Sequence, residues 1–543
     1  MRLPPVRTGV ASLAVVLAVL APLAAQQRSP SVTADQLLAG AGPQGTWLMF
    51  GGDYSGRRHS PLTQVTPQNV GRLLHQWTFQ TGTLGMFETT PLFHEGVLYV
   101  TGPNNHAWAL DARTGRPFWR YRRELPTDLR VCCGPVNRGF AALGNRLFMT
   151  TLDAHLVSLD ARTGAVVFDV PLDDYKKGYA STIAPLVVKN KVIVGVAGGE
   201  YGAPGFIDAY DVESGRRVWR HSTVPAPGEP GSETWPADSA ERGGAGVWVT
   251  GSYDPELNLL FYGTGNPAPD FHGEDRKGDN LFSNSLLAID ADTGKRRWHY
   301  QFTPFDVHDW DSTHVPILAD LTINGQPRKV VMVANRNGFY YTLDRTNGKV
   351  IVAKPYVLTT WAKEVGADGR PVLLPDNTPN EKGATTCPDL SGGTNFYPPS
   401  YDPALRLFFV NARETCATYF AWRPNFKRGE WFLGGATQRP PNSPDPFGAL
   451  RAIDPTTGER RWELKYPGPG TAGVLTTASG LAFTGDDEGS VLAVESRTGK
   501  LLWHYQMGAT VHGTSPMTYI LDGRQYVVVP AGVTLVAFAL PRP

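Results

Sequence analysis

One sequence pattern recurs seven times along this 543-residue chain and limits the folds that the chain can adopt. In each copy, an acidic residue at the end of a short apolar segment is followed eight positions later by a large apolar residue. The pairs are Asp111 and Trp119, Asp160 and Phe168, Asp211 and Trp219, Asp290 and Trp298, Asp344 and Val352, Asp454 and Trp462, and Glu495 and Trp503. Recurrence of this kind indicates a fold made of copies of one supersecondary unit.

Each copy has the pattern of a β-hairpin. A strand such as HAWALD (residues 106–111) ends at the acidic residue, a tight turn containing Gly follows, and a second strand begins. Gly supplies the positive φ that such turns require. Another strand precedes the hairpin, as in GVLYVTG at residues 96–102. The repeat is therefore a small antiparallel sheet, and its large apolar residue must pack against the next sheet.

The two ends of the chain resemble the missing parts of one further sheet. Trp77, in LHQWTFQTG, matches the last strand of a repeat, and TLVAFALP at residues 534–541 matches a hairpin strand without its partner. We therefore expect an all-β fold, an eight-bladed β-propeller closed by its N- and C-terminal strands. The interval from Val352 to Trp462 is 110 residues, which predicts a long insertion between about residues 353 and 445 of a single domain spanning 26–543.

Residues 1–25 have the features of a secretory signal peptide. Arg2 and Arg7 precede a short apolar segment at residues 10–20, and Ala24 and Ala25 offer small residues for cleavage. The alternative is a membrane anchor, but the apolar segment is shorter than the roughly 20 residues of a span, and no cysteine follows it for lipid attachment. We expect export to the periplasm without a stable membrane anchor. A net charge of +1 and the absence of a long basic run argue against nucleic acid as a partner.

Two of the four cysteines, Cys132 and Cys133, are neighbours in the segment VCCGPVNRG. Adjacent cysteines bond to each other only by closing a small strained ring, and such strain is typical of functional sites. The alternatives are two buried free thiols, or thiols that pair with distant partners. Export to an oxidising compartment favours the Cys132–Cys133 ring and a bridge between Cys387 and Cys416.

Several polar residues occur where neither a strand nor a turn requires them. Glu88 lies in FETTP and Thr182 in TIAP, while Glu200 follows Gly198 and Gly199 in VAGGEYG. Two glycines before a carboxylate let both backbone and side chain approach a ligand closely. For any one of these residues, a solvated loop position is the simpler interpretation, but the whole set is harder to explain in that way.

The polar residues also divide by chemistry. Glu200, Asn266 and Asp309 offer the oxygen ligands that a hard cation prefers. Arg138 and Arg336 suit an anion that carries carboxylates. The residues themselves thus suit two kinds of ligand, a hard cation and a carboxylate-bearing anion.

At these residues the sequence resembles the quinoprotein alcohol dehydrogenases, which are secreted eight-bladed propellers that bind pyrroloquinoline quinone (PQQ) and a metal ion. The segments CCGPVNRG, GTGNPAP and RNG carry the resemblance together with the spacing of Cys387 and Cys416, and it extends from about Trp47 to the C-terminus. It implies that the Cys132–Cys133 disulfide lies against one face of the quinone and Trp248, a flat stacking surface, against the other. The PQQ-binding residues implied in addition are Glu88, Arg138, Thr182, Gly198, Gly199, Arg336 and Asn395.

The resemblance also implies a reaction, the periplasmic oxidation of a small alcohol to an aldehyde or ketone. Glu200, Asn266 and Asp309 are the implied metal ligands, and the metal acts as a Lewis acid on the quinone. Asp309 is then the general base, and Arg336 stabilises the charge that develops on the quinone oxygens. The chain has no Cys-x-x-Cys-His haem motif, so we expect an external electron acceptor, a periplasmic cytochrome c.

Two other functions are compatible with the repeats. One is a quinoprotein dehydrogenase for sugars or polyols, and the other is a non-enzymatic secreted propeller that serves as an assembly scaffold. A scaffold has no use for adjacent cysteines or for the three implied metal ligands together. The chain departs from the family pattern at Ala197, where many relatives carry Ser, and at Gly470, where relatives usually carry Trp. These departures are expected to alter the affinity for the cofactor and the class of substrate, and Gly470 in particular to open the substrate pocket.

Asp311 lies two residues after Asp309 in HDWDS. Residues two apart in an extended backbone point the same way, so we expect both carboxylates to face one ion. In the family, an acidic residue at this position accompanies lanthanide use, although some sugar-oxidising relatives have a similar pair and use a divalent ion. The simpler alternative is that Asp311 caps a turn. The expected metal is therefore Ca²⁺ or a lanthanide.

Overall fold

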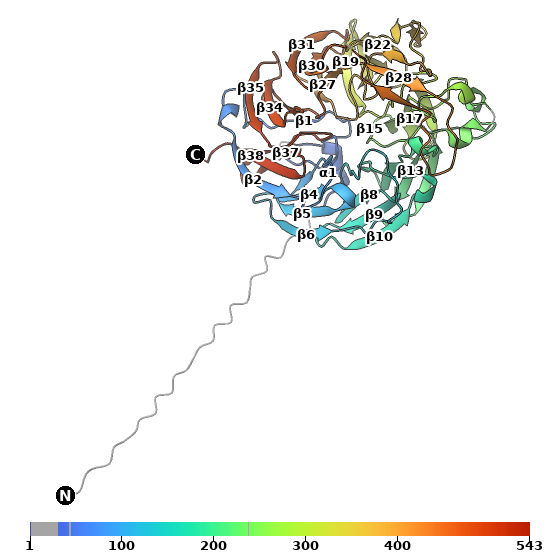
Figure 1. Ribbon diagram of the computed structural model, residues 1–543. Coiled ribbons are helices and arrows are strands. Elements are labelled where there is room, and N and C mark those ends of the chain that lie inside the picture. Colours follow the sequence, from blue (N-terminus) through green and yellow to red (C-terminus); the bar gives the residue numbers. More distant parts are fainter. Residues whose placement is uncertain (2–30, 43–44, 237, 442, 543) are drawn as a thin grey trace.

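The computed structural model describes residues 1, 31–42, 45–236, 238–441 and 443–542. Apart from Met1, the predicted signal peptide at residues 1–25 lies outside the described residues. Figure 1 shows sheets arranged around a common centre, with the chain progressing around it from blue to red. Helix α1 (Ala34–Ala39) is the one α-helix of the described part, so the prediction of an all-β fold is confirmed. In this part, no helix is long and apolar enough to cross a bilayer.

Within the described residues, seven sheets have four strands and one has five. The first sheets along the chain are β3 (Leu92–His94), β4 (Val97–Thr101), β5 (Ala107–Asp111) and β6 (Pro117–Tyr121); β7 (Ala141–Leu143), β8 (Arg146–Thr150), β9 (His155–Asp160) and β10 (Val166–Pro171); β11 (Leu186–Val188), β12 (Lys191–Gly195), β13 (Phe206–Asp211) and β14 (Arg217–Ser222); and β15 (Ser252–Asp254), β16 (Leu259–Gly263), β17 (Ser285–Asp290) and β18 (Arg296–Gln301).

The sheets that follow have the same antiparallel order. They are β19 (Ile317–Ile323), β20 (Gln326–Ala334), β21 (Phe339–Asp344) and β22 (Val350–Pro355); β26 (Ser400–Asp402), β27 (Leu407–Glu414), β30 (Phe447–Ile453) and β31 (Arg460–Tyr466); and β32 (Leu475–Thr477), β33 (Leu481–Gly485), β34 (Ser490–Glu495) and β35 (Leu501–Gln506), to which β1 (His59–Ser60) adds a parallel edge.

The repeated Trp and the Gly of the repeat turn explain how neighbouring sheets pack. The indole of Trp77 donates a hydrogen bond to the Ala112 carbonyl over 3.2 Å, and a Cβ on Gly115 would lie 2.6 Å from the Trp77 ring. Gly115 also has a φ of +72°, so this turn position excludes a side chain for two reasons. The same ring-to-glycine contact joins Trp119 to Gly164, Trp219 to Gly294, Trp298 to Gly348 and Trp462 to Gly499. The prediction that each large residue packs on the next sheet is thus confirmed for these tryptophans.

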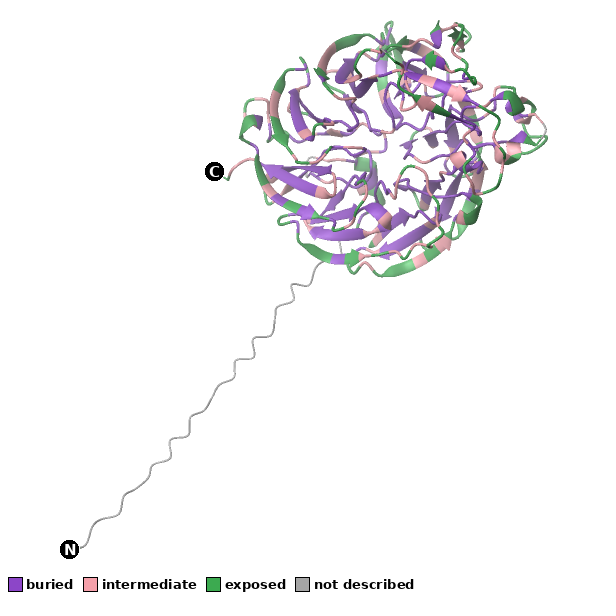
Figure 2. Ribbon diagram, viewed as in Figure 1, coloured by how far each residue is buried: buried purple, intermediate pink, exposed green. Residues whose placement is uncertain are grey.

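One sheet combines both ends of the chain. Strand β2 (Leu74–Gln80) pairs antiparallel with β38 (Thr534–Ala539), which continues through β37 (Arg524–Ala531) to β36 (Met517–Leu521). Trp503 of the preceding sheet lies with its ring 5.4 Å from that of Phe538. Figure 2 shows buried residues on the inner strands and between the sheets, and exposed residues along the outer rim.

The interval predicted as an insertion holds both propeller strands and separate structure. Strands β26 and β27 lie inside residues 353–445 but pair within a four-stranded sheet. The remaining strands form two small sheets, β23 (Ala362–Val365) with β24 (Pro371–Leu373), and β25 (Ala384–Thr386) with β28 (Ala417–Ala421) and β29 (Gly435–Gln438). The Trp310 ring packs 5.3 Å from Trp361 of this interval. These segments therefore support the loop that carries Asp309 and Asp311.

Candidate active site

A cavity of about 550 Å³ collects side chains from loops of several sheets. Its volume is in the range of small-molecule sites in proteins. Eleven of the predicted site residues line it: Glu88, Cys132, Cys133, Arg138, Thr182, Glu200, Trp248, Asp309, Asp311, Arg336 and Asn395. The loops that bring them together are far apart in the sequence, because each sheet contributes its own connection to the centre.

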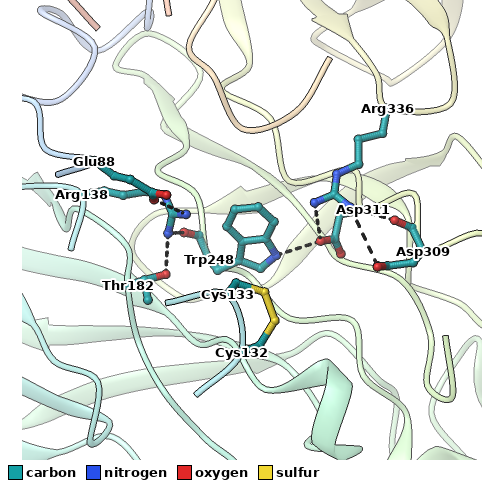
Figure 3. Close-up of a disulfide and its surroundings, with 9 residues drawn as sticks. All are labelled: Glu88, Cys132, Cys133, Arg138, Thr182, Trp248, Asp309, Asp311 and Arg336. Atoms are coloured by element: carbon teal, nitrogen blue, oxygen red, sulfur yellow. Dashed lines mark hydrogen bonds and ion pairs between the residues drawn. A yellow bond between two sulfur atoms is a disulfide. The ribbon is translucent and has the colours of Figure 1, made fainter. Parts of the chain in front are cut away.

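Cys132 and Cys133 form a disulfide on one side of this cavity, close to Trp248 (Figure 3). Cys133 has a φ of +70°, a left-handed conformation that non-glycine residues adopt at a cost. The second expected bridge, Cys387–Cys416, is also present. The tryptophan and the disulfide thus offer two apolar surfaces to the same cavity.

A cluster of buried charge lies beside Trp248. The Arg138 guanidinium pairs with Glu88 over 2.8 Å, and another of its nitrogens donates to the Thr182 hydroxyl. It also lies 4.8 Å from the Trp248 ring centre and 4.4 Å from that of Phe396. Burial raises the pKa of Glu88 to about 7, although Arg138 opposes this shift. The same burial lowers the pKa of Arg138.

Arg336 connects the two aspartates of the HDWDS segment (Figure 3). One of its terminal nitrogens donates to the Asp309 carbonyl oxygen over 2.7 Å, and the other lies 3.3 Å from the Asp311 carboxylate. Asp311 accepts two further hydrogen bonds, from the Trp248 indole over 3.1 Å and from the Asn266 backbone N–H over 2.9 Å. The indole that faces the disulfide and the carboxylate predicted to hold a metal are therefore in direct contact.

The backbone at Asp309 differs from the expected extended conformation. Asp309 has a φ of +59°, so the two carboxylates do not reach the cavity by the alternation of a strand. The loop is held instead by Asp306, whose carboxylate accepts hydrogen bonds from the backbone N–H groups of His308 and Trp310. This turn, and not an extended strand, presents Asp309 and Asp311 to the same cavity. That both carboxylates face one ion remains a prediction.

Buried negative charge exceeds positive charge on this side of the cavity. Glu200, Asp270, Asp309 and Asp311 all line it, with Arg336 as the cation that pairs with Asp309 and Asp311. Burial raises the pKa of Glu200 to about 7, and Asp311 adds to that shift. Burial and the charge of Asp270 raise the pKa of Asp309 well above its ordinary value. Carboxylates gathered in this way fit a multivalent cation.

The expected ligands do not form a closed coordination shell. Among the described residues, the group of possible ligand atoms within 4.8 Å of one another contains Glu200 with Cys132 and Cys133, whose sulfurs are bonded to each other. The carboxylates of Asp309 and Asp311 are oriented toward Arg336 instead. A cation would compete with Arg336 for these two groups.

Three predicted residues do not line the cavity, namely Asn266, Gly198 and Gly199. Asn266 is buried and reaches the site through its backbone bond to Asp311. Gly198 has a φ of +128°, and a Cβ there would lie 2.4 Å from the Gly178 carbonyl oxygen, so its need for glycine is explained by packing. Gly470 also lies off the cavity lining, and a Cβ there would lie 2.6 Å from the Tyr466 hydroxyl.

The sequence analysis missed several lining residues. Asp270 carries charge, Ser391 and Thr437 carry hydroxyls, and most of the others are apolar or aromatic, among them Met86, Phe271, Leu390, Trp431, Leu433 and His512. No local pattern distinguishes these residues from those of an ordinary loop. Asp270 alone could have been recognised from the sequence, because it is a carboxylate at the end of GTGNPAPD, the same Gly- and Pro-rich segment that contains Asn266.

The donor groups present fit PQQ and a metal ion. The buried Nε atoms of Arg138 and Arg336, two arginines that line the cavity, have no hydrogen-bond partner among the described residues, so donors for an anionic ligand remain. The family model described as "PQQ: Glucose/ethanol/alcohol dehydrogenase, beta-propeller domain" matches residues 47–354 and 433–527. The chain belongs to the PQQ-dependent quinoprotein alcohol dehydrogenase family.

Individual relatives span most of both chains. The quinoprotein alcohol dehydrogenase PedH of Pseudomonas putida is 40% identical over 505 residues, covering 88% of this chain and 84% of PedH. The 1-butanol dehydrogenase (cytochrome c) of Thauera butanivorans is 36% identical, covering 90% and 74%. The solved structure of a europium-containing methanol dehydrogenase superposes with a TM-score of 0.88 at 34% identity, covering 93% of this chain and all of that one.

Proposed function

We propose that this protein is a periplasmic enzyme that oxidises an alcohol to the aldehyde or ketone with bound PQQ and one metal ion, Ca²⁺ or a lanthanide. The observation that carries the proposal is the convergence of the Cys132–Cys133 disulfide, Trp248 and a group of buried carboxylates on one cavity. Relatives named as alcohol dehydrogenases and a europium-containing methanol dehydrogenase support it. A scaffold protein has no need of these buried charges.

The proposed roles follow from position and chemistry. When bound, PQQ supplies the electron acceptor and the metal ion polarises its carbonyl as a Lewis acid. Asp309 accepts the proton of the alcohol hydroxyl as general base, and Arg336 supplies positive charge beside it. The residues proposed to hold PQQ are Cys132, Cys133, Trp248, Glu88, Arg138, Thr182, Arg336 and Asn395, and those for the metal are Glu200, Asn266, Asp309 and Asp311. Gly198 and Gly199 do not line the cavity, and their proposed part is to let the chain before Glu200 approach the cofactor closely.

The state of Asp309 depends on the cation. In the buried site its pKa is raised, which favours the protonated form that cannot act as a base. A bound cation would oppose this shift, because a nearby positive charge favours the ionised carboxylate. The proposed metal ion would therefore act on the cofactor and would also keep the Asp309 carboxylate ionised, as a general base requires.

We further propose how the protein is organised around this site. Residues 1–25 act as the signal peptide for export, and residues 26–543 form one domain of eight blades, in which the β2–β38 pair closes the ring. The segments between about 353 and 445 that lie outside the blade sheet form an insertion. Electrons leave to an external acceptor, a periplasmic cytochrome c, since the chain has no haem motif of its own and one relative is named for this acceptor.

Reconstitution tests the proposal. Purified protein is loaded with PQQ and either Ca²⁺ or La³⁺, and reduction of an artificial dye is measured with ethanol, longer primary alcohols, glucose and polyols. We expect PQQ-dependent turnover of alcohols that is lost in Asp309→Asn. Turnover of glucose or polyols alone would support the alternative quinoprotein function, and failure to bind PQQ at all would favour a scaffold. Reduction of a purified c-type cytochrome tests the acceptor.

A further inference from the structure

We propose that Asp270 is an additional anionic ligand of the metal site, acting together with Glu200, Asn266, Asp309 and Asp311. This inference rests on the proposed function, because it assumes that the carboxylate side of the cavity holds an ion. It extends that function by adding a fourth carboxylate, which biases the site toward trivalent ions.

Asp270 lies in the connection between β16 and β17, four residues after Asn266. Its side chain lines the same cavity as the other carboxylates, although the residue is only 1% exposed. The backbone beside it is anchored on both sides, by a hydrogen bond from Ala268 N–H to Gly243 and another from Phe271 N–H to Leu433. The carboxylate is thus held at the cavity by a fixed segment of chain.

The Asp270 carboxylate has an unused oxygen. Its Oδ1 is buried and accepts no hydrogen bond, and no Arg, Lys or His nitrogen of the described residues lies within 4.0 Å of the carboxylate. The nearest candidate cation, Arg276, directs its guanidinium to the carbonyl oxygens of Pro269 and Asp306 and to the Asn280 side chain. A buried carboxylate without a cation is unfavourable unless it takes up a proton or binds a cation, so Asp270 is a candidate ligand.

A structural role does not account for this arrangement. Asp306 is equally buried and shows what such a role looks like, because its carboxylate accepts bonds from His308, Trp310 and Asn284 and fixes the loop. Asp270 has an interaction with the Asn266 side chain and feels the charge of Arg276, but in the described part of the chain its Oδ1 accepts no hydrogen bond, and no backbone N–H of its own loop is bound by it. Its carboxylate instead adds negative charge next to Glu200 and Asp309, where three further carboxylates already exceed the charge of Arg336.

This charge count has a chemical consequence. Hard cations prefer carboxylate oxygens, and the number of anionic ligands sets the affinity and the preferred ion charge. Four carboxylates and one amide suit a trivalent lanthanide better than Ca²⁺. Asp270 therefore contributes to ion choice as well as to affinity.

The test is binding of Eu³⁺ to the full chain after metal is stripped with a chelator. Affinity is measured by titration, and luminescence lifetimes in H₂O and D₂O count the waters on the bound ion. We expect Asp270→Ala to weaken Eu³⁺ binding by at least about tenfold and to add a coordinated water, since solvent fills the vacated position. Asp270→Asn should lose affinity while preserving shape, and the loss for Ca²⁺ should be smaller.

The matched control is Asp275→Asn, which removes one charge from the same connection but lies outside the cavity lining and pairs with Arg423 on the surface. Circular dichroism and the unfolding temperature of each metal-free variant check that it is folded. Unchanged affinity and water count in both Asp270 variants would overturn this inference and leave the proposed function intact. If the wild-type chain binds neither Eu³⁺ nor Ca²⁺, or if Glu200→Gln binds as well as the wild type, the proposed metal site itself fails.

Discussion

The indole Nε1 of Trp248 donates a hydrogen bond to Oδ2 of Asp311 over 3.1 Å (Figure 3). This bond joins the aromatic surface proposed for the cofactor to a carboxylate proposed for the metal. Arg336 contacts the same carboxylate oxygen at 3.3 Å. We therefore expect substitutions of Trp248 to change both cofactor affinity and metal affinity.

We predict that Trp248→Ala weakens PQQ binding by about tenfold or more. Aromatic stacking contributes about 0.5–1.5 kcal/mol beyond area burial, and loss of the ring also removes burial of the cofactor. Trp248→Phe keeps an aromatic face but loses the bond to Asp311, so its loss of PQQ affinity should be smaller. Affinity is measured by titrating metal-loaded protein with PQQ.

The control for this pair is Trp422→Ala, which removes an exposed indole outside the cavity lining. Its PQQ affinity should match the wild type. If Trp248→Ala also binds PQQ normally, Trp248 is a packing residue and does not form a face of the cofactor site.

We predict that the exported protein contains the Cys132–Cys133 disulfide. Trypsin cleavage after Arg130 and Arg138 releases residues 131–138, which contain both cysteines. Without reduction, this peptide should be lighter by two hydrogens than its reduced form and should resist alkylation. The peptides that carry Cys387 and Cys416 should be joined to each other. Recovery of residues 131–138 with both cysteines alkylated before reduction would contradict the assignment.

The fold could be predicted from the sequence because its information is local and repeated. An acidic residue precedes each turn, most of the turn glycines lie under a tryptophan ring of the preceding sheet, and the pattern recurs at one spacing, as Trp77 and Gly115 illustrate. The segment around Trp77 resembles the last strand of a repeat, and residues 534–541 resemble the hairpin strand that would precede it. The pairing of β2 with β38 could therefore be predicted.

The site was less accessible to sequence reasoning. Cys132 and Cys133 could be recognised because they are adjacent in the sequence. Asp270, in contrast, is a single aspartate after a proline, and only the folded chain shows that its Oδ1 accepts no hydrogen bond. The conformation of Asp309 was also misjudged, because its left-handed φ depends on Asp306 capping the loop from three residues away. Short irregular loops are determined by such contacts rather than by periodicity.

We predict that His221 and His299 contribute stability that is lost as pH decreases from about 6.5 to about 4. The buried Glu88 and Glu200, whose pKa values are raised to about 7, act in the opposite direction, so the test compares variants and not the total slope. Burial, with the charge of Arg296 in addition, lowers the pKa of His221 and of His299 to about 4. In this window the unfolded chain binds protons that the folded chain excludes, so acid favours unfolding. Each histidine contributes at most about 1.4 kcal/mol per pH unit. Urea unfolding at several pH values measures the slope, which should be shallower in His299→Gln and unchanged in the exposed-site variant His75→Gln. Equal slopes in all three proteins would show that these histidines do not control acid stability.

The last prediction separates the two aspartates of the metal site. Asp311→Asn keeps an oxygen that can accept the bonds from Trp248 and the Asn266 backbone but removes a negative charge. Because a trivalent ion depends more on anionic ligands than Ca²⁺ does, La³⁺-dependent ethanol oxidation should fall by about 100-fold, and much of any Ca²⁺-dependent activity should persist. Dye-linked assays of protein loaded with each ion measure both rates. Equal losses with both ions would make Asp311 a structural residue of the loop, and no loss would remove it from the site. Asp309→Asn should abolish turnover with either ion, since the proposed general base is then absent whichever metal is bound.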